Sequence, residues 1–476
     1  MAKKTAKRLV FILSMAVLLG LLSLGLVFLK REDVNVPAPL ELPDVEYLID
    51  YRDEKYGGLE SVTVRNEKGE YTILPGDPPV IPGWESLIVN NFPLSRIVDI
   101  CDSILSRGLV AEDADPAVYG LDAPRAQAVI KTKSGEGTTL YIGNDVPDGA
   151  GIYVRLEDRP GVYQAGKWDT ETFFQGVFDF VDKEISPQLP DDGFGGFEFK
   201  EIVLGGTARR DGPIRVVYEA RESQPGRLKN EYRISGPIEG SLNMDRGYNI
   251  LKGIPGLYAD QAVARIDGEG DLARYGLAAP YSTASISGAQ EPEAFSLAAS
   301  KPDEDGNVYI CREGVGLVYQ AAASNVPWLE ATWWDLMERM IILPFIDDIA
   351  RVEVNSPQRR VVFTLTGEGD DLKVEAGGLE LDTSFFRSYY QTLLSAIYDE
   401  YTEEKIPSGA QPIMEIVYHY RDGRPLNRVS FYSAPSRRVL TSLDGGRPFY
   451  TYSAYITKVQ ADLERLLEGQ KVMPYL

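Results

Sequence analysis

The chain has 476 residues, of which 44% are hydrophobic and 25% are charged, a composition that excludes a disordered or low-complexity chain over most of its length. Its length indicates about three domains. The 71 acidic and 49 basic side chains give a net charge of −22, which argues against nucleic-acid binding because such a surface repels phosphate backbones.

The N-terminus predicts an uncleaved signal-anchor. Residues 1–8 carry a cluster of lysine and arginine, residues 9–29 are uncharged, and Lys30 and Arg31 follow. As a helix, the uncharged stretch is about 30 Å long, which matches a bilayer core. We expect 9–29 to span the cell membrane once, with 1–8 as a cytoplasmic tail and the body extracytoplasmic. A cleaved signal peptide is the alternative, but its apolar stretch would be shorter and a small-residue cleavage site would follow.

Residues 30–44 are charged and rich in proline, which predicts an extended stalk between the membrane and the folded body. Only two cysteines follow, Cys101 and Cys311. Two are too few for a disulfide-stapled scaffold. We expect two buried thiols, and the sequence leaves open whether they pair.

A repeat organises the rest of the chain. "YGLDAP" at 119–124 recurs as "YGLAAP" at 275–280, which is 156 positions further on. Tyr153 and Tyr309 have the same separation, and so do the two copies of Val-Tyr-Gln at 162–164 and 318–320. A fixed offset over such a length indicates a duplicated domain, far longer than the unit of a solenoid.

Each repeat predicts a β-hairpin, a helix, the YGL turn, four strands and a closing helix. In repeat 1 (45–190) these are the hairpin 59–74, a helix over 94–105 with Gly108 as its stop, strands within 126–165 and a helix over 170–185. In repeat 2 (191–345) they are strands at 200–206 and 214–220, a weaker helix at 244–254, strands within 282–322 and a closing segment at 333–345. Repeat 3 (346–476) is divergent, with a hairpin at 349–369, a helix over 382–401, "KIPSGAQP" (405–412) in place of the turn, strands within 413–454 and a helix over 455–469.

The predicted fold class is therefore α+β: a transmembrane helix followed by three tandem units, each a mostly antiparallel sheet with covering helices. The hexapeptide is interpreted as a structural turn, whose defining residues are Tyr119, Gly120, Leu121, Pro124, Tyr275, Gly276, Leu277 and Pro280. Tyrosine and leucine can anchor it in the core, while glycine permits a positive φ. The residue before proline is driven into extended geometry, so a helix ends there and a strand begins.

The search for catalytic, cofactor and metal sites yields none. "GVYQAGKW" (161–168) has the glycine and lysine spacing of a P-loop, but Trp168 stands where a magnesium-binding hydroxyl is needed and repeat 2 lacks the lysine. The single histidine, His419, lies on a predicted strand, and one histidine with two cysteines cannot build a common zinc site.

Acidic stretches are interpreted as turns. The stretch 302–307 has alternating acids, but Gly314 occupies the place of the bidentate glutamate of a calcium loop. The stretch 267–271 is interpreted in the same way. A glycosidase needs only two carboxylates at any separation in sequence, so an acidic pair stays open as an alternative. The many aromatic residues are interpreted mainly as core.

The repeats resemble the bacterial family of domain of unknown function 4340. The resemblance rests on the two YGLxxP turns, on "LYIGNDVPDGAGIYVR" (140–155) followed by "GVYQA" (161–165), and on "MERMIILPFIDDIARVEV" (337–354). It covers nearly all of 45–470. It implies a membrane-anchored extracytoplasmic protein encoded beside ABC transporters of the gliding-motility type, and it brings no catalytic residues.

We therefore expect a non-enzymatic extracytoplasmic scaffold or binding protein, an accessory component of an ABC-type transport system. Its expected partners are the membrane through 9–29 and transporter subunits or cell-envelope components, without nucleic acid or cofactor. The alternatives are a cell-envelope glycan hydrolase that uses an acidic pair, and a ligand-binding subunit with a pocket between domains.

Overall fold

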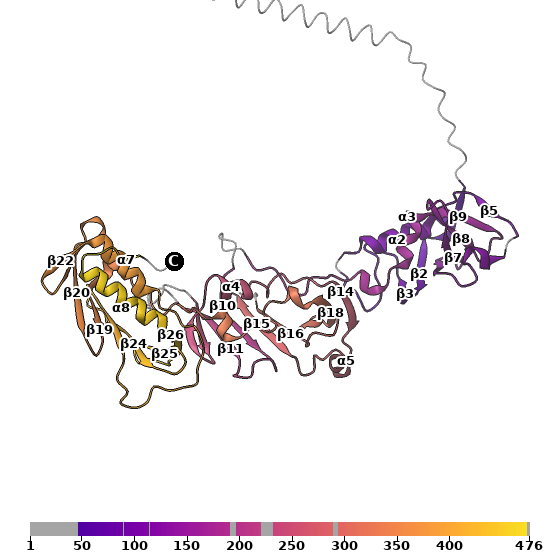
Figure 1. The fold of residues 1–476 in the computed structure, drawn as a ribbon. Coiled ribbons are helices and arrows are strands. Elements are labelled where there is room, and N and C mark those ends of the chain that lie inside the picture. Colours follow the sequence, from indigo (N-terminus) through magenta and orange to yellow (C-terminus); the bar gives the residue numbers. More distant parts are fainter. Residues whose placement is uncertain are drawn as a thin grey trace, which may run out of the picture. The chain divides into compact units, whose positions relative to one another are not determined.

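The computed structural model describes residues 46–88, 90–113, 115–190, 197–219, 232–288 and 294–473 (Figure 1). The predicted tail (1–8), anchor (9–29) and stalk (30–44) lie outside these residues. Within the described residues, no helix is both long enough and apolar enough to cross a membrane. The chain folds into two compact units, one comprising the chain up to Gly83 and Asn91–Gly176, the other Trp84–Asn90 and the chain from Val177.

The first unit is built around a seven-stranded sheet of order β3-β2-β6-β7-β8-β9-β5, with β1 and β4 forming a separate pair. Its strands are β1 (Tyr47–Asp50), β2 (Leu59–Asn66), β3 (Gly69–Ile73), β4 (Ser103–Leu105), β5 (Leu109–Ala111), β6 (Ala126–Thr132), β7 (Gly137–Asp145), β8 (Gly151–Leu156) and β9 (Val162–Gly166). Its helices are η1 (Glu54–Tyr56), α2 (Phe92–Asp102), η2 (Pro116–Tyr119), α3 (Lys167–Thr170) and η3 (Glu171–Phe174), where η marks a 3-10 helix. The core lies where α2, through Leu94 and Ile97, covers the buried side chains of β2.

The second unit contains two sheets, of order β13-β12-β11-β10-β15-β16-β17-β18-β14 and β22-β21-β20-β19-β23-β24-β25-β26. The strands of the nine-stranded sheet are β10 (Phe199–Gly205), β11 (Ile214–Tyr218), β12 (Tyr232–Gly236), β13 (Glu239–Ser241), β14 (Gln261–Arg265), β15 (Ser282–Gly288), β16 (Ala294–Ala299), β17 (Asn307–Arg312) and β18 (Leu317–Ala322). Those of the eight-stranded sheet are β19 (Ile349–Asn355), β20 (Arg360–Thr366), β21 (Lys373–Ala376), β22 (Leu379–Leu381), β23 (Met414–Tyr420), β24 (Asn427–Ser433), β25 (Arg438–Leu443) and β26 (Phe449–Tyr452).

Short helices connect these strands, and two longer ones cover the eight-stranded sheet. They are η4 (Val177–Asp179), α4 (Arg246–Leu251), α5 (Glu269–Arg274), η6 (Ala323–Asn325), α6 (Trp333–Leu336), η7 (Ile346–Asp348), η8 (Gly369–Asp371), α7 (Thr383–Leu394) and α8 (Ser453–Leu467). Figure 1 shows α7 and α8 lying side by side over the sheet. Each buries an apolar stripe that includes Phe386 and Tyr389 on α7 and Val459 on α8, as amphipathic helices do.

The three large sheets share one strand order. In each, the first hairpin strand pairs with its hairpin partner on one side and with the third strand on the other, and a four-stranded meander follows. The shared orders are β3-β2-β6-β7-β8-β9, β11-β10-β15-β16-β17-β18 and β20-β19-β23-β24-β25-β26. All their pairings are antiparallel. The α+β class is therefore confirmed, and the third region repeats the topology without the YGL turn.

The segment that enters each sheet region pairs with the segment that follows its first helix. In the first unit β1 pairs with β4, directly after α2. In the second unit Glu184 bridges Tyr258, and Met340 bridges Ile397 shortly after α7. This pairing corrects two predictions, because the predicted helices over 94–105 and 382–401 end at Asp102 and Leu394. The residues that follow each helix pair instead with a segment that lies far away in the sequence, and no local pattern predicts that pairing.

Two of the three predicted closing helices are also wrong, whereas the third, over 455–469, is confirmed as α8. In place of a helix over 170–185 the chain forms three short helical turns, α3, η3 and η4. The side chain of Asn66 donates hydrogen bonds of 2.7 Å to the carbonyl oxygens of Phe173 and Gln175, which a continuous helix would use internally. In place of a helix over 333–345, only α6 is helical. The stretch at 267–271 is likewise not a simple turn, since the Asp271 carboxylate accepts the amide of Gly268 and caps α5.

Candidate functional site

The candidate site surrounds the segment 337–342, which runs between the two sheets of the second unit. On one side Leu242, just after β13, bridges Met337, and the Glu338 amide donates to the Ser241 carbonyl over 2.8 Å. On the other side the Tyr398 amide donates to the Arg339 carbonyl, also over 2.8 Å. The segment is extended because its amides and carbonyls are used by these two partners in turn.

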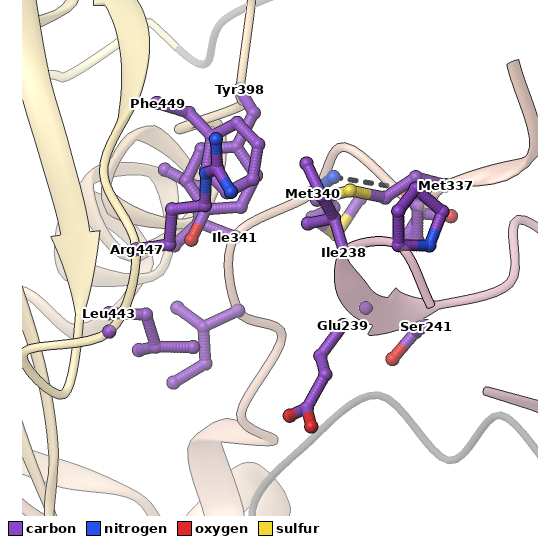
Figure 2. A pocket seen from close by; sticks show the side chains of 15 residues that line it. Ile238, Glu239, Ser241, Met337, Met340, Ile341, Tyr398, Leu443, Arg447 and Phe449 are labelled. Atoms are coloured by element: carbon purple, nitrogen blue, oxygen red, sulfur yellow. Dashed lines mark hydrogen bonds between the residues drawn. The ribbon is translucent and has the colours of Figure 1, made fainter. Parts of the chain in front are cut away.

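A pocket of about 390 Å³ lies where the segment stops pairing with the strand end at Leu242 and begins pairing with Ile397. Figure 2 shows two walls, with Ile238 and Met340 on one side and Leu443, Phe449 and Arg447 on the other. The remaining lining residues are Pro237, Glu239, Gly240, Ser241, Met337, Glu338, Ile341, Ile342, Tyr398 and Gly446. The lining combines apolar side chains with polar ones, among them Glu239, Glu338 and Arg447, so the pocket is suited to an amphipathic small molecule.

Aromatic rings support the wall formed by the eight-stranded sheet. The Phe449 ring centroid lies 4.4 Å from that of Tyr398 and 5.9 Å from that of Trp334. The Arg339 guanidinium lies 4.5 Å above the Trp334 ring, and burial lowers the pKa of Arg339. Arg447 stacks on Tyr401 and donates a hydrogen bond to its hydroxyl. These contacts fix the wall, because offset and cation–π contacts restrict the rings.

Glu338 holds the segment through both of its carboxylate oxygens. One Glu338 carboxylate oxygen accepts the Asn243 side-chain amide at 2.7 Å, and the other accepts the Met340 amide at 2.9 Å. Glu239 and Arg447 lie at the exposed rim. The pocket can therefore offer both apolar and polar contacts to a small molecule. Its lining contains no histidine or cysteine.

The predicted turn residues form two equivalent turns. Gly120 and Gly276 have φ of 68° and 70°, which confirms the predicted positive φ. The amides of Leu121 and Leu277 donate back to the carbonyls of Pro116 and Leu272 at 2.9 and 2.8 Å, a helix-ending pattern. Both leucines are buried.

The tyrosines of the turn are only half-buried, which corrects the expectation that they lie in the core. Tyr119 packs edge-on against Tyr153, and Tyr275 packs in the same way against Tyr309, with centroids 4.8 and 5.0 Å apart. In both repeats, therefore, the tyrosine of the turn packs against the second tyrosine that recurs after 156 positions. Pro124 lines a separate polar cavity of about 530 Å³ with Arg65, Arg125 and Phe174 among its neighbours, so the turns do not contribute to the pocket at 337–342.

The P-loop-like stretch holds an ion pair. The Lys167 ammonium lies 2.9 Å from the Asp145 carboxylate, which also pairs with Arg125 at 2.7 Å. The hydrogen bond from Lys167 is the main cause that lowers the pKa of Asp145. The Lys167 ammonium therefore forms an ion pair within the protein, in place of the phosphate contact that a P-loop lysine makes.

The histidine and the cysteines have structural surroundings. His419 lies on β23, as predicted, with its Nε2 2.9 Å from the buried Glu353 carboxylate. Cys101 and Cys311 are both buried and free, which confirms two buried thiols, and burial raises the pKa of each. The acidic stretch 302–307 forms the predicted turn, with the Gly306 amide donating to the Asp303 carbonyl over 3.1 Å. Among the described residues, no group of three or more His, Cys, Asp or Glu side chains could hold a metal ion.

Two carboxylates of the first unit have opposed surroundings. Burial raises the pKa of Asp102, whereas the hydrogen bond from Arg52 lowers the pKa of Asp50. An acid and a base of a hydrolase need such a difference. Neither residue lines the pocket at 337–342 or the cavity beside Pro124.

The pocket was missed at the level of sequence because 333–345 was interpreted as a closing helix. Two signals indicate the extended conformation: the β-branched pair Ile341 and Ile342, and Pro344 two residues later, which disfavours a helix before it. The partners of the segment lie more than fifty residues away on both sides, and no local pattern identifies them.

One family matches the chain. It is described as Domain of unknown function (DUF4340), and it matches residues 80–212 and 233–411, about two thirds of the chain. Each match begins after the first hairpin strands of one sheet and runs into those of the next, so the connecting segments belong to the matched pattern. No curated protein and no solved structure matches.

Proposed function

Because the chain belongs to the DUF4340 family, we propose that it is a non-enzymatic, membrane-anchored extracytoplasmic scaffold. It is held by residues 9–29 and serves as an accessory component of an ABC-type transport system of the gliding-motility kind. Its partners are transporter subunits or components of the cell envelope.

The observation that carries this proposal is that the strand order recurs along the chain, whereas the polar side chains of the first repeat do not. Strand order and turn recur, but the ion-paired trio Arg125, Asp145 and Lys167 of repeat 1 does not. The positions 156 residues further on are Tyr281, Lys301 and Ala323. A repeated catalytic centre would keep such a constellation, whereas a scaffold needs only the framework and varies its surfaces.

The topology is tested by adding protease to intact cells whose outer barrier, if present, has been opened. We expect the body from residue 46 onward to be digested and an N-terminal fragment to stay with the membrane. A version lacking residues 1–31 serves as the control and should no longer sediment with membranes. Full protection of the body in intact cells would contradict the extracytoplasmic location.

The partner is tested by purification of the full chain in mild detergent, followed by identification of the proteins that accompany it. We expect subunits of an ABC transporter at a fixed ratio to the chain. The control is the version without the anchor, which separates co-residence in the membrane from contact with the body. Recovery of no transporter subunit would contradict the accessory role.

The pocket at 337–342 favours a second candidate, a ligand-binding subunit. Its mixed apolar and polar lining is compatible with a small-molecule site, and native mass spectrometry of the purified chain would detect a bound molecule. Leu443→Trp, which fills the pocket, should remove that molecule. Leu379→Trp, at an exposed position on the edge strand β22, should keep it. The same spectrum for wild type and Leu443→Trp would exclude this candidate.

A further inference from the structure

The first unit carries an exposed aromatic patch, formed by Phe92, Arg96 and Trp168. Trp168, on α3, has 72% of its surface exposed, and Phe92, at the start of α2, has 73% exposed. The Arg96 guanidinium lies 4.1 Å above the indole ring and donates a 2.6 Å hydrogen bond to the Trp168 carbonyl. Phe92 lies one helical turn before Arg96, on the same side of α2. The indole is thus held in place at the surface instead of being packed into the core.

This chemistry fits the boundary between lipid and water. Tryptophan is enriched there because its ring is apolar and its N–H is polar. Arginine adds a cation that contacts phosphate groups while its stem covers apolar surface. Phe92, one helical turn from Arg96 on α2, adds an exposed and purely apolar ring. An amphipathic surface of this composition lies flat in the headgroup region.

The patch lies near the point at which the chain enters the unit. The Ser106 amide donates to the Glu46 carbonyl over 2.8 Å, and the next amide, that of Arg107, donates to the Gln164 carbonyl over 2.8 Å. Two residues after β9 ends at Gly166, the chain reaches Trp168. The first described residue is therefore two hydrogen-bonded strands away from the α3 end of the patch.

Two more apolar side chains are exposed at the same edge. Leu105 is the strand partner of Tyr47, at the start of the described chain, and Leu109 lies on the edge strand β5. Both are exposed. The side of the unit at which the chain enters therefore presents several exposed apolar groups, and exposed acidic residues such as Glu112 and Asp113 follow β5 directly.

The covalent connection keeps this side close to the bilayer. The fifteen residues of 30–44 span at most about 50 Å when fully extended. A tether of this length gives the patch a high effective concentration at the membrane. A patch that binds too weakly to hold a free protein at the membrane can then still dock, because the anchor already attaches the chain to the bilayer.

We propose that Phe92, Arg96 and Trp168 dock the first unit onto the headgroup region of the membrane that holds the anchor. The occupant is a phospholipid surface, bound mainly through the two aromatic rings. This inference rests on the anchoring proposed above. Docking would fix the orientation of the first unit toward the bilayer and leave the second unit to contact other partners.

The test uses the full chain reconstituted into phosphatidylcholine vesicles, with bromine atoms on the upper part of the acyl chains as quenchers of tryptophan fluorescence. Flotation first shows whether the chain is held by the vesicles. We expect brominated lipid to quench a component of the wild-type emission that Trp168→Phe lacks, so the quenched fraction falls severalfold. Phe92→Ser should reduce it as well, and Leu379→Ser, which changes an exposed leucine on the second unit, should not.

The outcomes are distinct. Failure to float overturns the anchoring and the docking with it. Flotation with equal quenching in wild type and Trp168→Phe overturns the docking alone. Quenching that survives in Trp168→Phe but is lost in Trp84→Phe would place a different surface at the bilayer and would also overturn it.

Discussion

Replacing the turn glycines by alanine separates the cost of a positive φ from the cost of a steric clash. Both turns have the positive φ, but only the first has the clash. Gly120 and Gly276 have nearly the same positive φ, 68° and 70°. A methyl group on Gly276 would lie 3.5 Å from the Ser300 Cβ, an ordinary contact. A methyl group on Gly120 would lie 2.5 Å from the Asn144 Oδ1, so the Asn144 side chain must move. Gly149, with φ of 70° and no neighbour within 4 Å, is the matched control in the first unit.

The expected costs follow from these distances. The left-handed conformation costs a non-glycine residue about 1–2 kcal/mol, so Gly276→Ala and Gly149→Ala should each lose about that much local stability. Gly120→Ala should lose roughly 1 kcal/mol more, because Asn144 must leave its preferred rotamer. Asn144 is exposed, which keeps this addition small. In the double variant Gly120→Ala with Asn144→Ala this extra loss should disappear, which gives a coupling energy of about 1 kcal/mol between the two substitutions.

The assay is hydrogen exchange over a denaturant series, read peptide by peptide, since a chain with several domains does not unfold in one step. The relevant peptides contain β6 and β15, the strands that follow the two turns. The reasoning is refuted if Gly120→Ala costs no more than Gly149→Ala, or if removing the Asn144 side chain does not recover the difference.

The other predictions concern buried and paired groups. Cys101 and Cys311 should not react with a thiol reagent at mildly alkaline pH until the chain is unfolded, because burial raises the pKa of each thiol; rapid reaction of the folded chain would contradict their burial. Arg209→Ala should destabilise the nine-stranded sheet by about 2–4 kcal/mol in the same exchange assay, because its guanidinium donates to two backbone carbonyls; a neutral effect would show that water replaces it. For Glu353, burial opposes ionisation, but hydrogen bonds and charges from its arginine and histidine neighbours outweigh it and lower the pKa. Its contribution is therefore complete at neutral pH and lost as the pH falls below about 4, so Glu353→Gln should flatten the acid limb of stability against pH, and an unchanged limb would argue against it. Lys167→Ala should leave stability almost unchanged, as expected of an exposed ion pair, and should leave the thermal melting curve equally insensitive to added ATP; an ATP shift in the wild type alone would restore the P-loop interpretation.

Much of the fold could be predicted from the sequence, because its signals are local. Alternation of apolar residues marked the hairpin strands and the later four strands of all three sheets, though not the additional strands such as β5, β14 and β22. The fixed offset of 156 positions revealed the duplication. The positive φ of Gly120 and Gly276 followed from the residues around them, since proline and glycine restrict the backbone of their own neighbours. The burial of Cys101 followed from its position on the apolar stripe of α2.

The candidate site could not be predicted, because the local residues indicate at most an extended segment and do not identify its distant partners. Residues 337–342 have the apolar character of a closing helix, yet they are extended because one end pairs with Leu242 and the other with Ile397. The residues after α2 and α7 become strands for the same reason. Hydrogen bonding between segments that lie far apart in the chain outweighs local helical preference. The pocket exists only where those two pairings diverge, so it is a property of the tertiary structure alone.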